Sequence, residues 1–423
     1  MHDQPPIPIV VLAAAFVVAG PLNPPAGPVT GTYKTLTEVE PRTPISSLPC
    51  YISQPGSYYL TGNLTIGGGV TGINVGANNV TIDLNGFTLD GNANTGYRAI
   101  FAESRLNLTV RNGRIANWSH EGIDAYGSHQ VRVENIGVDN SVAGWGIIVG
   151  YTSVVSNCQV RGSAAGIIVG DGSTVSGCAV EGCQRGYEVA AGSSISGCTS
   201  VANSANGYEI GAGVSADNCT ARGNGATGFQ AAAGCTFSRC TASSNTGKGF
   251  QIDGAGQLLD STSSGNGGIG VDIIPPGGGI AIAGRVDRCT INFNGSHGLN
   301  QGGGGGSTFS NNLISRNAGA GIVVVDGNLI SNNRIIDNGA GGVAAGVQVN
   351  GWVNTIQGNS LLNNGVMYSF AAGTGGNLFF GNTCSGGAQF NSGSNTIAPF
   401  VNAATAFAGG SLASSNGFVN VQY

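Results

Sequence analysis

The stretch from residue 158 to residue 198 reads CQVRGSAAGIIVGDGSTVSGCAVEGCQRGYEVAAGSSISGC, and it decides the fold. Its cysteine spacing continues through Cys219 and Cys240, at successive intervals of 20, 20, 21 and 21 residues. A glycine keeps the same period and opens segments such as Gly186-Tyr-Glu-Val, which alternate apolar and polar residues as half-buried strands do. A repeat of about 21 residues has room for three short strands and three turns. The pattern therefore predicts a solenoid of stacked coils.

The same register extends in both directions and predicts fourteen coils. The cysteine position is taken upstream by Asn85, Asn112 and Asn135, and downstream by Ser261, Cys289, Asn312, Asn333, Asn359 and Asn382. Five residues later runs a second column: Asn117, Asn140, Asn203, Asn224, Asn245, Asn266, Asn294, Asn317, Asn338 and Asn364. Asparagine tolerates the left-handed backbone conformation, and stacked amides can bond to one another. We therefore expect a tight asparagine turn in every coil.

The glycine-led segments predict which face of their sheet is buried. The residue after each glycine is apolar and should point inward: Ile123, Ile147, Ile167, Tyr187, Tyr208, Phe229, Phe250, Val271, Leu299, Ile322 and Val347. The next residue should mostly face water: Asp124, Glu188, Glu209, Gln230, Gln251, Asp272, Asn300 and Gln348, interrupted by Ile148, Ile168 and Val323.

Composition supports a single repetitive domain. Glycine accounts for 75 of 423 residues and charged residues for only 9%, yet 41% hydrophobic residues and strict periodicity argue against disorder. The net charge of −5 comes from sparse, mixed charges without a basic patch, which argues against a nucleic-acid partner. Lysine occurs only at Lys34 and Lys248, which disfavours an enzyme that acts on polyanionic pectate.

The ends of the chain differ from the repeats. The apolar run at 9–19 has the length of a secretory signal, so residues 1–19 are predicted to direct export; the alternative is an apolar strand of the N-terminal cap. No second apolar segment predicts a membrane span in the mature chain. We expect an N-terminal cap over 20–61, a β-helix over 62–395 and a C-terminal cap over 396–423. Caps are needed because open solenoid ends expose strand edges.

Cysteine spacing also bears on redox chemistry. Stacked side chains on neighbouring coils lie about 4.8 Å apart at Cβ, beyond the roughly 3.5 to 4.5 Å of a disulfide. The regularly spaced cysteines are therefore predicted to be buried free thiols, whereas Cys50, Cys183, Cys235 and Cys384 lie off their column.

With these columns, the chain resembles the right-handed parallel β-helix proteins of the pectin-lyase-like superfamily. The resemblance is carried by the asparagine turns, the Gly-aromatic-Glu strands and repeats such as residues 331–338, SNNRIIDN. The segments 52–65 and 79–90 look like secreted bacterial members whose activity is generally unassigned. The resemblance implies an all-β, single-stranded right-handed parallel β-helix with three sheets. It also implies that enzymes of the family act on the first sheet, which precedes the cysteines, beneath loops that follow the third, glycine-led sheet.

The first sheet offers one candidate site. Two residues before each cysteine, a serine-rich outward column is broken by Asp217 and Asp287, and Arg239, Asp260 and Arg288 lie beside it. The three aspartates could hold Ca²⁺ as oxygen ligands, and either arginine could act as the base of a uronate lyase if its pKa were lowered. The alternative is a surface cluster of ion pairs. Glycine-rich insertions at 275–279 and 301–306 should lie side by side at one edge of the sheet. Asp272 and Asn300 are further candidate ligand-binding residues. The alternative is that the insertions are tolerated without a function.

The third sheet offers a second candidate site. Glu188 and Glu209 occupy equivalent positions one coil apart, at a Cα spacing of about 4.8 Å that suits the two carboxyls of a retaining glycosidase. Any two stacked acids share that spacing, so a solvated ridge is the alternative.

Three classes of function remain open on the sequence. The first is a secreted or cell-surface β-helix that binds an extended polysaccharide. The second is a polysaccharide lyase, with calcium, or a glycoside hydrolase. The third is a purely structural rod. No cofactor other than calcium is indicated.

Overall fold

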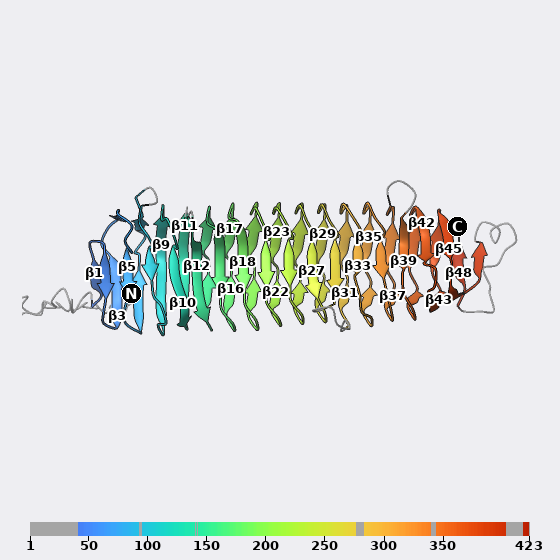
Figure 1. Cartoon of the computed structure of the whole chain (residues 1–423), viewed down its shortest axis with the longest axis horizontal. Coiled ribbons are helices and arrows are strands. Elements are labelled where there is room, and N and C mark those ends of the chain that lie inside the picture. Colours follow the sequence, from blue (N-terminus) through green and yellow to red (C-terminus); the bar gives the residue numbers. More distant parts are fainter. Residues whose placement is uncertain are drawn as a thin grey trace, which may run out of the picture. The chain divides into compact units, whose positions relative to one another are not determined.

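The computed structural model describes residues 41–92, 95–139, 141, 143–275, 283–339, 344–402 and 418–422. All elements below lie in the compact unit Arg42–Tyr423, in which strands follow one another coil after coil (Figure 1). The described residues form strands and no helix, and thus no helix among them could cross a membrane. The predicted signal segment, Asn140 and most of the insertion after Pro275 lie outside the described residues.

One sheet, here called sheet B, is built from the glycine-led strands. It contains sixteen parallel strands, one per coil, two coils more than predicted. The strands are β2 (Cys50–Ile52), β5 (Ile73–Val75), β8 (Ile100–Phe101), β10 (Ile123–His129), β12 (Trp145–Tyr151), β15 (Ala165–Val169), β18 (Arg185–Val189), β21 (Tyr208–Ile210), β24 (Phe229–Ala231), β27 (Phe250–Asp253), β30 (Val271–Ile274), β33 (Leu299–Gln301), β36 (Ile322–Val324), β39 (Ala345–Val349), β42 (Val366–Phe370) and β45 (Ala388–Asn391).

The other two predicted sheets are joined into sheet A, of 32 strands. They join because β9 (Leu108–Ala116) and β11 (Arg132–Asp139) continue through a corner that interrupts the strands of later coils. The strands before that corner are β1 (Thr43–Ile45), β3 (Gly56–Leu60), β6 (Val80–Asp83), β13 (Val154–Ser156), β16 (Thr174–Ser176), β19 (Ser194–Ser196), β22 (Ser215–Asp217), β25 (Thr236–Ser238), β28 (Gln257–Leu259), β31 (Arg285–Asp287), β34 (Thr308–Ser310), β37 (Leu329–Ser331), β40 (Thr355–Gln357), β43 (Gly375–Phe380) and β46 (Ser394–Ile397).

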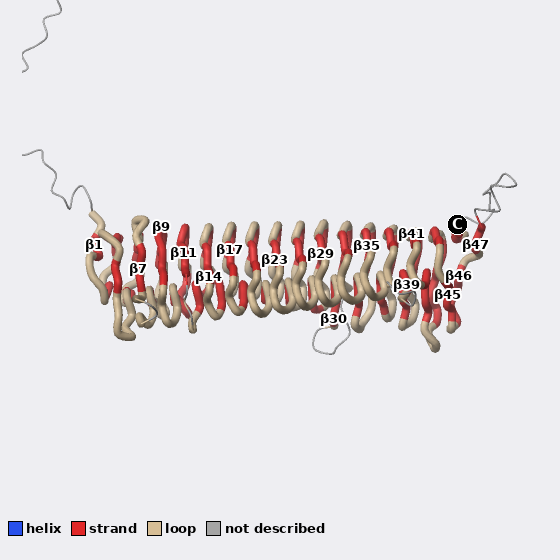
Figure 2. The backbone as a smooth tube through the Cα atoms, turned by 90° about the horizontal axis from the view of Figure 1, so that it is seen from above, coloured by secondary structure: helices blue, strands red, loops and turns tan. Residues whose placement is uncertain are grey.

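The strands of sheet A after the corner form a second row, and Figure 2 shows how strands and turns repeat along the unit. They are β4 (Leu64–Thr65), β7 (Thr88–Asp90), β14 (Gln159–Arg161), β17 (Ala179–Glu181), β20 (Thr199–Val201), β23 (Thr220–Arg222), β26 (Thr241–Ser243), β29 (Thr262–Ser264), β32 (Thr290–Asn292), β35 (Leu313–Ser315), β38 (Arg334–Ile336), β41 (Ser360–Leu362), β44 (Thr383–Ser385), β47 (Phe400–Asn402) and β48 (Asn420–Gln422). Coil pairing thus begins at Thr43, before residue 62, and includes strands beyond residue 395.

Most corners of a coil are a residue with positive φ followed by an inward-facing residue. In the coil that contains Cys158, the positive-φ residues are Asn157, Gly162 and Gly172. The inward residues that follow them are Cys158, Ser163 and Ser173, all buried. Side chains at these positions accept hydrogen bonds from the backbone N–H one coil earlier, as when Ser173 Oγ accepts from Ser153 N at 3.0 Å. Polar corner side chains therefore satisfy backbone donors that turn away from the sheets.

The asparagine columns form ladders, as expected. In the ladder from Asn203 to Asn364, each Oδ1 from Asn224 onward accepts from both the backbone N and the Nδ2 of the asparagine one coil earlier, for example at 3.0 and 2.9 Å between Asn224 and Asn245. Two further ladders run from Asn312 to Asn420 and from Asn328 to Asn395. Except at the last positions, Asn395 and Asn420, the left-handed residue is the one before the ladder position, so amide hydrogen bonding, and not backbone tolerance, accounts for these asparagines.

The predicted columns upstream of Cys158 are wrong by one residue. Asn112 and Asn135 have φ of 58° and 54° and pair in register with Asn157, not with Cys158. The inward cysteine position is occupied there by Ile136, which is buried. Asn85 and Asn117 also have positive φ, and buried Trp118 follows Asn117. Asparagine suits both corner positions: the first because it tolerates positive φ, and the second because its amide forms the ladder. The residue type alone therefore did not reveal the shift of one residue.

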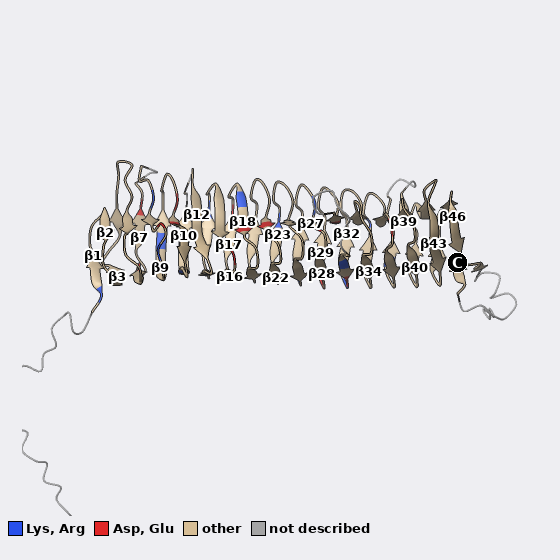
Figure 3. Ribbon diagram, turned by 60° about the horizontal axis from the view of Figure 1, so that its bottom comes forward, with Lys and Arg blue, Asp and Glu red and all other residues tan. Residues whose placement is uncertain are grey.

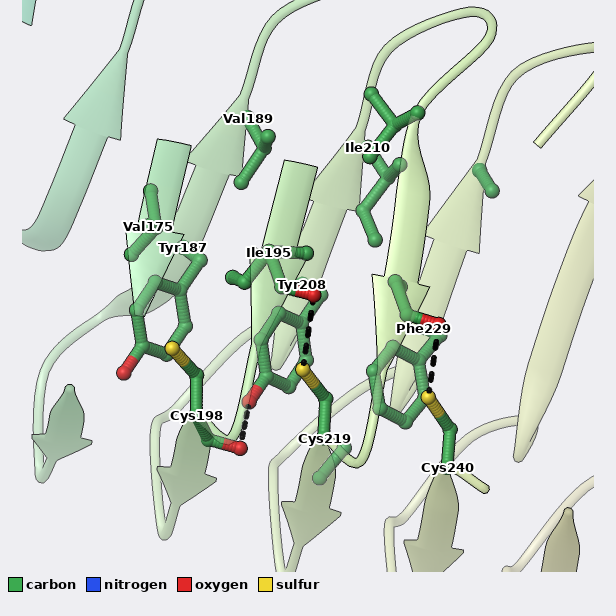
Figure 4. Packing of buried hydrophobic residues seen from close by; sticks show 14 of the residues in the cluster. Val175, Tyr187, Val189, Ile195, Cys198, Tyr208, Ile210, Cys219, Phe229 and Cys240 are labelled. Atoms are coloured by element: carbon green, nitrogen blue, oxygen red, sulfur yellow. Dashed lines mark hydrogen bonds between the residues drawn. The ribbon is translucent and has the colours of Figure 1, made fainter. Parts of the chain in front are cut away.

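The predicted inward column of sheet B is confirmed. Every member from Ile123 to Val347 is buried and pairs in register with its neighbours. In the middle of the column, the rings of Tyr187, Tyr208, Phe229 and Phe250 stack at centroid distances of 4.8, 4.5 and 4.8 Å. Figure 4 shows the first three of these rings. The buried Tyr208 hydroxyl donates to the backbone carbonyls of Cys198 and Thr220 at 2.8 and 3.1 Å.

All ten cysteines are free, as predicted for the regularly spaced ones, and all but Cys50 are buried. Figure 4 shows Cys198, Cys219 and Cys240 stacked on successive coils. One of the cysteines off the regular column occupies another ladder: Cys183 precedes Asn203 in it and accepts from Ser163 N. Burial raises the pKa of Cys289 to about 12, so this thiol stays protonated at neutral pH.

Candidate functional site

The first-sheet candidate residues lie in the predicted register, but they form ion pairs with one another. Asp217, in β22, stands in line with Ser196 and Ser238 on the adjacent strands. Arg239 lies beside it with a φ of 53° at the corner after β25, and its Nη2 is 2.5 Å from a carboxylate oxygen of Asp217. Both side chains are well exposed.

Asp260, Asp287 and Arg288 form a second group of ion pairs. Arg288 bonds both oxygens of Asp260, at 2.7 and 2.9 Å, and also contacts Asp287. Asp287 has an exposed fraction of 0%, where an outward, accessible position was expected. It accepts hydrogen bonds from Ser310 Oγ at 2.7 Å and Asn311 Nδ2 at 2.8 Å, and Arg285 lies 2.9 Å away.

These contacts speak against the lyase arrangement. Within the described part of the chain, no group of three or more His, Cys, Asp or Glu residues could hold a metal ion, so Asp217, Asp260 and Asp287 do not converge as calcium ligands. A catalytic arginine base needs a lowered pKa. The hydrogen bond to Asp260 and the charge of Asp287 instead raise the pKa of Arg288. Arg239 forms an ion pair with Asp217. The ion-pair alternative describes this surface.

Asp272 and Asn300 are also occupied by structural contacts. Asp272 is buried, lies 2.6 Å from Lys248 Nζ, and accepts a hydrogen bond from Asn300 Nδ2 at 2.7 Å. The pair is adjacent in sheet B through β30 and β33. A ligand would have to displace one of these partners.

The third-sheet carboxylates are brought together as predicted. Glu188 in β18 and Glu209 in β21 are register partners. Arg185 Nη1 lies between them, 3.4 Å from Glu188 and 3.5 Å from Glu209. Asn206 Nδ2 donates to both Glu209, at 3.1 Å, and Gln230, at 2.8 Å. Both carboxylates remain partly exposed.

These two carboxylates line a groove of about 610 Å³ that follows sheet B from β10 to β27. Its floor includes the outward residues Ile148, Ile168, Glu188, Glu209 and Gln230. One side is made of small residues at the strand ends: Gly150, Gly170, Ala190, Gly211 and Ala232. They leave a hollow, and at Gly150 a Cβ would come within 2.0 Å of the Ser128 carbonyl oxygen, so coil packing itself demands glycine there.

Two exposed tyrosines stand at the N-terminal end of the groove. Tyr126 and Tyr151 have exposed fractions of 65% and 44%, and both line the groove. The Tyr151 ring stacks on His129 at a centroid distance of 5.0 Å, which restrains its orientation. Exposed aromatic rings beside hydrogen-bonding side chains offer both apolar and polar contact to one ligand.

A second cavity, of about 290 Å³, adjoins the groove through Tyr126. Within it, Arg98 Nε lies 2.9 Å from Glu121 and 3.2 Å from Asp124, and its guanidinium lies over the rings of Tyr97 and Phe101. Burial raises the pKa of the Asp124 carboxyl, although Arg98 opposes the shift. The same face of sheet B therefore continues with aromatic and charged side chains toward the N-terminal coils.

Sequence reasoning identified Glu188 and Glu209 but missed the tyrosines and the groove. Two signals were present in the sequence. Ile148 and Ile168 interrupt the outward polar column, and a small residue follows each glycine-led strand near them, as Gly150 and Gly170 do. Together these signals indicate a hollow with an apolar floor.

The fold and its repeated corners define the class of protein: a right-handed parallel β-helix. The family model of the right-handed beta helix region matches residues 98–236 and 229–399, so the chain belongs to this family. No curated protein matches the sequence.

Several solved structures are similar to the chain. The mannuronan C-5 epimerase AlgE6 A-module of Azotobacter vinelandii is 17% identical, with 81% of this chain and 91% of that chain covered and a TM-score of 0.41. The periplasmic alginate epimerase AlgG is 12% identical, over 84% and 78%, with a TM-score of 0.33. A tailspike protein mutant of E. coli bacteriophage HK620, in complex with a hexasaccharide, is 12% identical, over 87% and 71%, with a TM-score of 0.32.

Proposed function

We propose that the chain binds an extended polysaccharide in the groove on sheet B. The observation that carries the proposal is the groove itself, which joins the exposed rings of Tyr126 and Tyr151 to Glu188, Glu209 and Gln230 along consecutive strands. Aromatic rings can stack on sugar faces, and carboxylates and amides accept or donate hydrogen bonds to hydroxyls.

The repeat of the fold suits a repeating ligand. Neighbouring strands lie about 4.8 Å apart, so equivalent side chains recur along the groove at a constant interval. An extended sugar chain likewise presents equivalent groups at regular steps, and it could contact several coils at once. The apolar run at 9–19, interpreted as an export signal, supports an encounter with such a polymer outside the cell.

A glycan screen with the full chain tests the proposal. Tyr126→Ala combined with Tyr151→Ala should weaken binding of any positive glycan about thirtyfold, because each stacked ring contributes about 1 kcal/mol. Phe293→Ala is the matched control, since this aromatic residue is 53% exposed but lies after β32 of sheet A. Equal affinity of the double variant and the wild type would refute the groove as the binding site.

Glycoside hydrolysis is the second candidate function, favoured by one observation. Glu188 and Glu209 face the same groove from adjacent strands, as a pair of catalytic carboxyls would. Arg185 contacts both, which suits binding more than proton donation. Measuring reducing ends in the same screen separates the two functions: products that vanish in Glu188→Gln or Glu209→Gln would establish hydrolysis.

A further inference from the structure

The groove on sheet B is strongly acidic. Four carboxylates line it, from Asp171, Glu188, Glu209 and Asp253, and none of the described residues that line it is Lys or Arg. Arg185, just outside the lining, contacts Glu188 and Glu209 and offsets one of the four charges. Figure 3 shows acidic segments near β18, on the glycine-led face.

The adjoining cavity has the same sign. Glu103, Glu121 and Asp124 line it together with a single cation, Arg98. The two cavities thus combine seven carboxylates with two arginines, an excess of five negative charges. The whole chain has 21 acidic and 16 basic residues, also an excess of five. The two cavities therefore account for the whole net negative charge, and the rest of the chain has equal numbers of acidic and basic residues.

Two of the groove carboxylates, those of Asp171 and Asp253, form no ion pair and no side-chain hydrogen bond with another described residue, although the charge of Lys248 acts on Asp253. Asp171 is exposed and Asp253 half-buried, and they lie on opposite sides of the Glu188–Glu209 pair along the sheet. By contrast, the first-sheet carboxylates Asp217 and Asp260 are each neutralised by an arginine. Unpaired carboxylates in a groove attract cations and repel anions.

We propose that the groove selects a polysaccharide of amino sugars with free, protonated amino groups, and discriminates against polyuronates. This inference rests on the proposed function and specifies its ligand. Ammonium groups spaced along the glycan would pair with carboxylates on successive coils, while sugar faces stack on Tyr126 and Tyr151. A uronate polymer of the same length would place its carboxylates against those of the groove.

The test compares three hexamers on the full chain by isothermal titration calorimetry, at about pH 5.5, where exposed carboxyls are ionised. The hexamers are those of glucosamine, N-acetylglucosamine and galacturonate. We expect the glucosamine hexamer to bind at least about tenfold more tightly than its acetylated counterpart, and galacturonate to give no binding heat. The preference should shrink as salt increases, because exposed charges are screened.

Charge variants test whether the groove carboxylates cause the preference for the glucosamine hexamer. Asp171→Asn combined with Asp253→Asn should weaken binding of the glucosamine hexamer about tenfold, without leaving an internal cation unpaired. The control combines Glu181→Gln with Asp337→Asn, which changes the net charge equally but alters carboxylates paired with Arg161 and Arg316 in sheet A. This control should bind as the wild type does. Circular dichroism of each variant confirms that it is folded.

The outcomes separate the two proposals. If the acetylated or the galacturonate hexamer binds as tightly as the glucosamine hexamer, and Tyr126→Ala with Tyr151→Ala removes that binding, the amino-sugar inference is wrong while the groove remains a glycan site. An equal loss in the control charge variant would also overturn the inference, because the effect would then come from net charge. If no hexamer and no glycan of the screen binds, both proposals are wrong.

Discussion

The asparagine ladder makes a quantitative prediction at Asn245, which is 1% exposed. Its Oδ1 accepts from the backbone N and the Nδ2 of Asn224, at 3.0 and 2.9 Å. Its Nδ2 donates to Asn266 Oδ1 at 2.9 Å and to the Ala221 carbonyl at 3.1 Å. Asn245→Ala therefore removes four hydrogen bonds and leaves buried donors and acceptors on both neighbouring coils without their hydrogen-bond partner.

The expected loss of stability is about 4 kcal/mol. Each net hydrogen bond in a protein contributes about 1 kcal/mol, and a buried donor left unpaired costs at least as much. That loss is large for a single substitution. Because each coil contacts only its neighbours, the variant should also unfold the adjoining coils at lower urea concentration.

Urea titration followed by circular dichroism measures the loss, and Asn117→Gly is the matched control. The sequence places Asn117 in the same column as Asn245, but the structure places it one residue earlier, half-buried, at a φ of 60°. Glycine adopts that backbone readily, so we expect a loss of about 1 kcal/mol or less. Similar losses in both variants, or a loss below about 1 kcal/mol for Asn245→Ala, would refute the assigned corner geometry.

Three further predictions follow from the core and from sheet A. Phe229→Asp should unfold the β-helix cooperatively, because it buries an unpaired charge in the aromatic stack; a thermal melt close to wild type would contradict the register. Thiol titration should find Cys158 to Cys240 unreactive until denaturant is added, and peptides linked by disulfides in mass spectrometry would exclude this prediction. Asp287→Asn should destabilise by about 2 kcal/mol, whereas Asp260→Asn, on an exposed pair, should barely change stability; equal effects would count against the burial of Asp287.

The pH dependence at Asp287 has a definite sign. Burial opposes ionisation of this carboxyl, but hydrogen bonds from Ser310 and Asn311 and the charges of Arg288 and Arg285 outweigh it and lower its pKa. A carboxyl with a lowered folded-state pKa stabilises the fold fully above its unfolded value of about 3.9, and this contribution is lost as the pH falls through the folded-state value. Acid titration of Asp287→Asn should therefore show a smaller loss of stability below about pH 4 than the wild type.

The fold was predictable because its period is visible in the sequence. The predicted register was wrong only where asparagine suits both of two adjacent corner positions. From Cys158 to Cys240 the coils have nearly constant length, so one residue type reports one position. Upstream, asparagine appears at the left-handed position, as at Asn135, and the adjacent inward position is filled by Ile136. The residue type alone could not separate the positions. The apolar residues that follow Asn117 and Asn135, Trp118 and Ile136, were the better guide.

The candidate site was less predictable, because the sequence does not show which charged side chains form ion pairs with one another. Asp217 and Arg239 looked like separate reactive groups in the sequence, yet the corner geometry directs each at the other. The depth of the groove depends on side-chain size along one edge of sheet B, which the alternation of polar and apolar residues does not report. The outward carboxylates Glu188 and Glu209 were recognised as a pair, but not the hollow between them and Tyr151.

The stacking of coils has a mechanical consequence. Backbone hydrogen bonds of both sheets, and the side-chain ladders at the corners, join each coil to the next and so run along the stacking direction. A pulling force applied along that direction is carried by every coil interface in series, and the interface with the weakest set of bonds yields first.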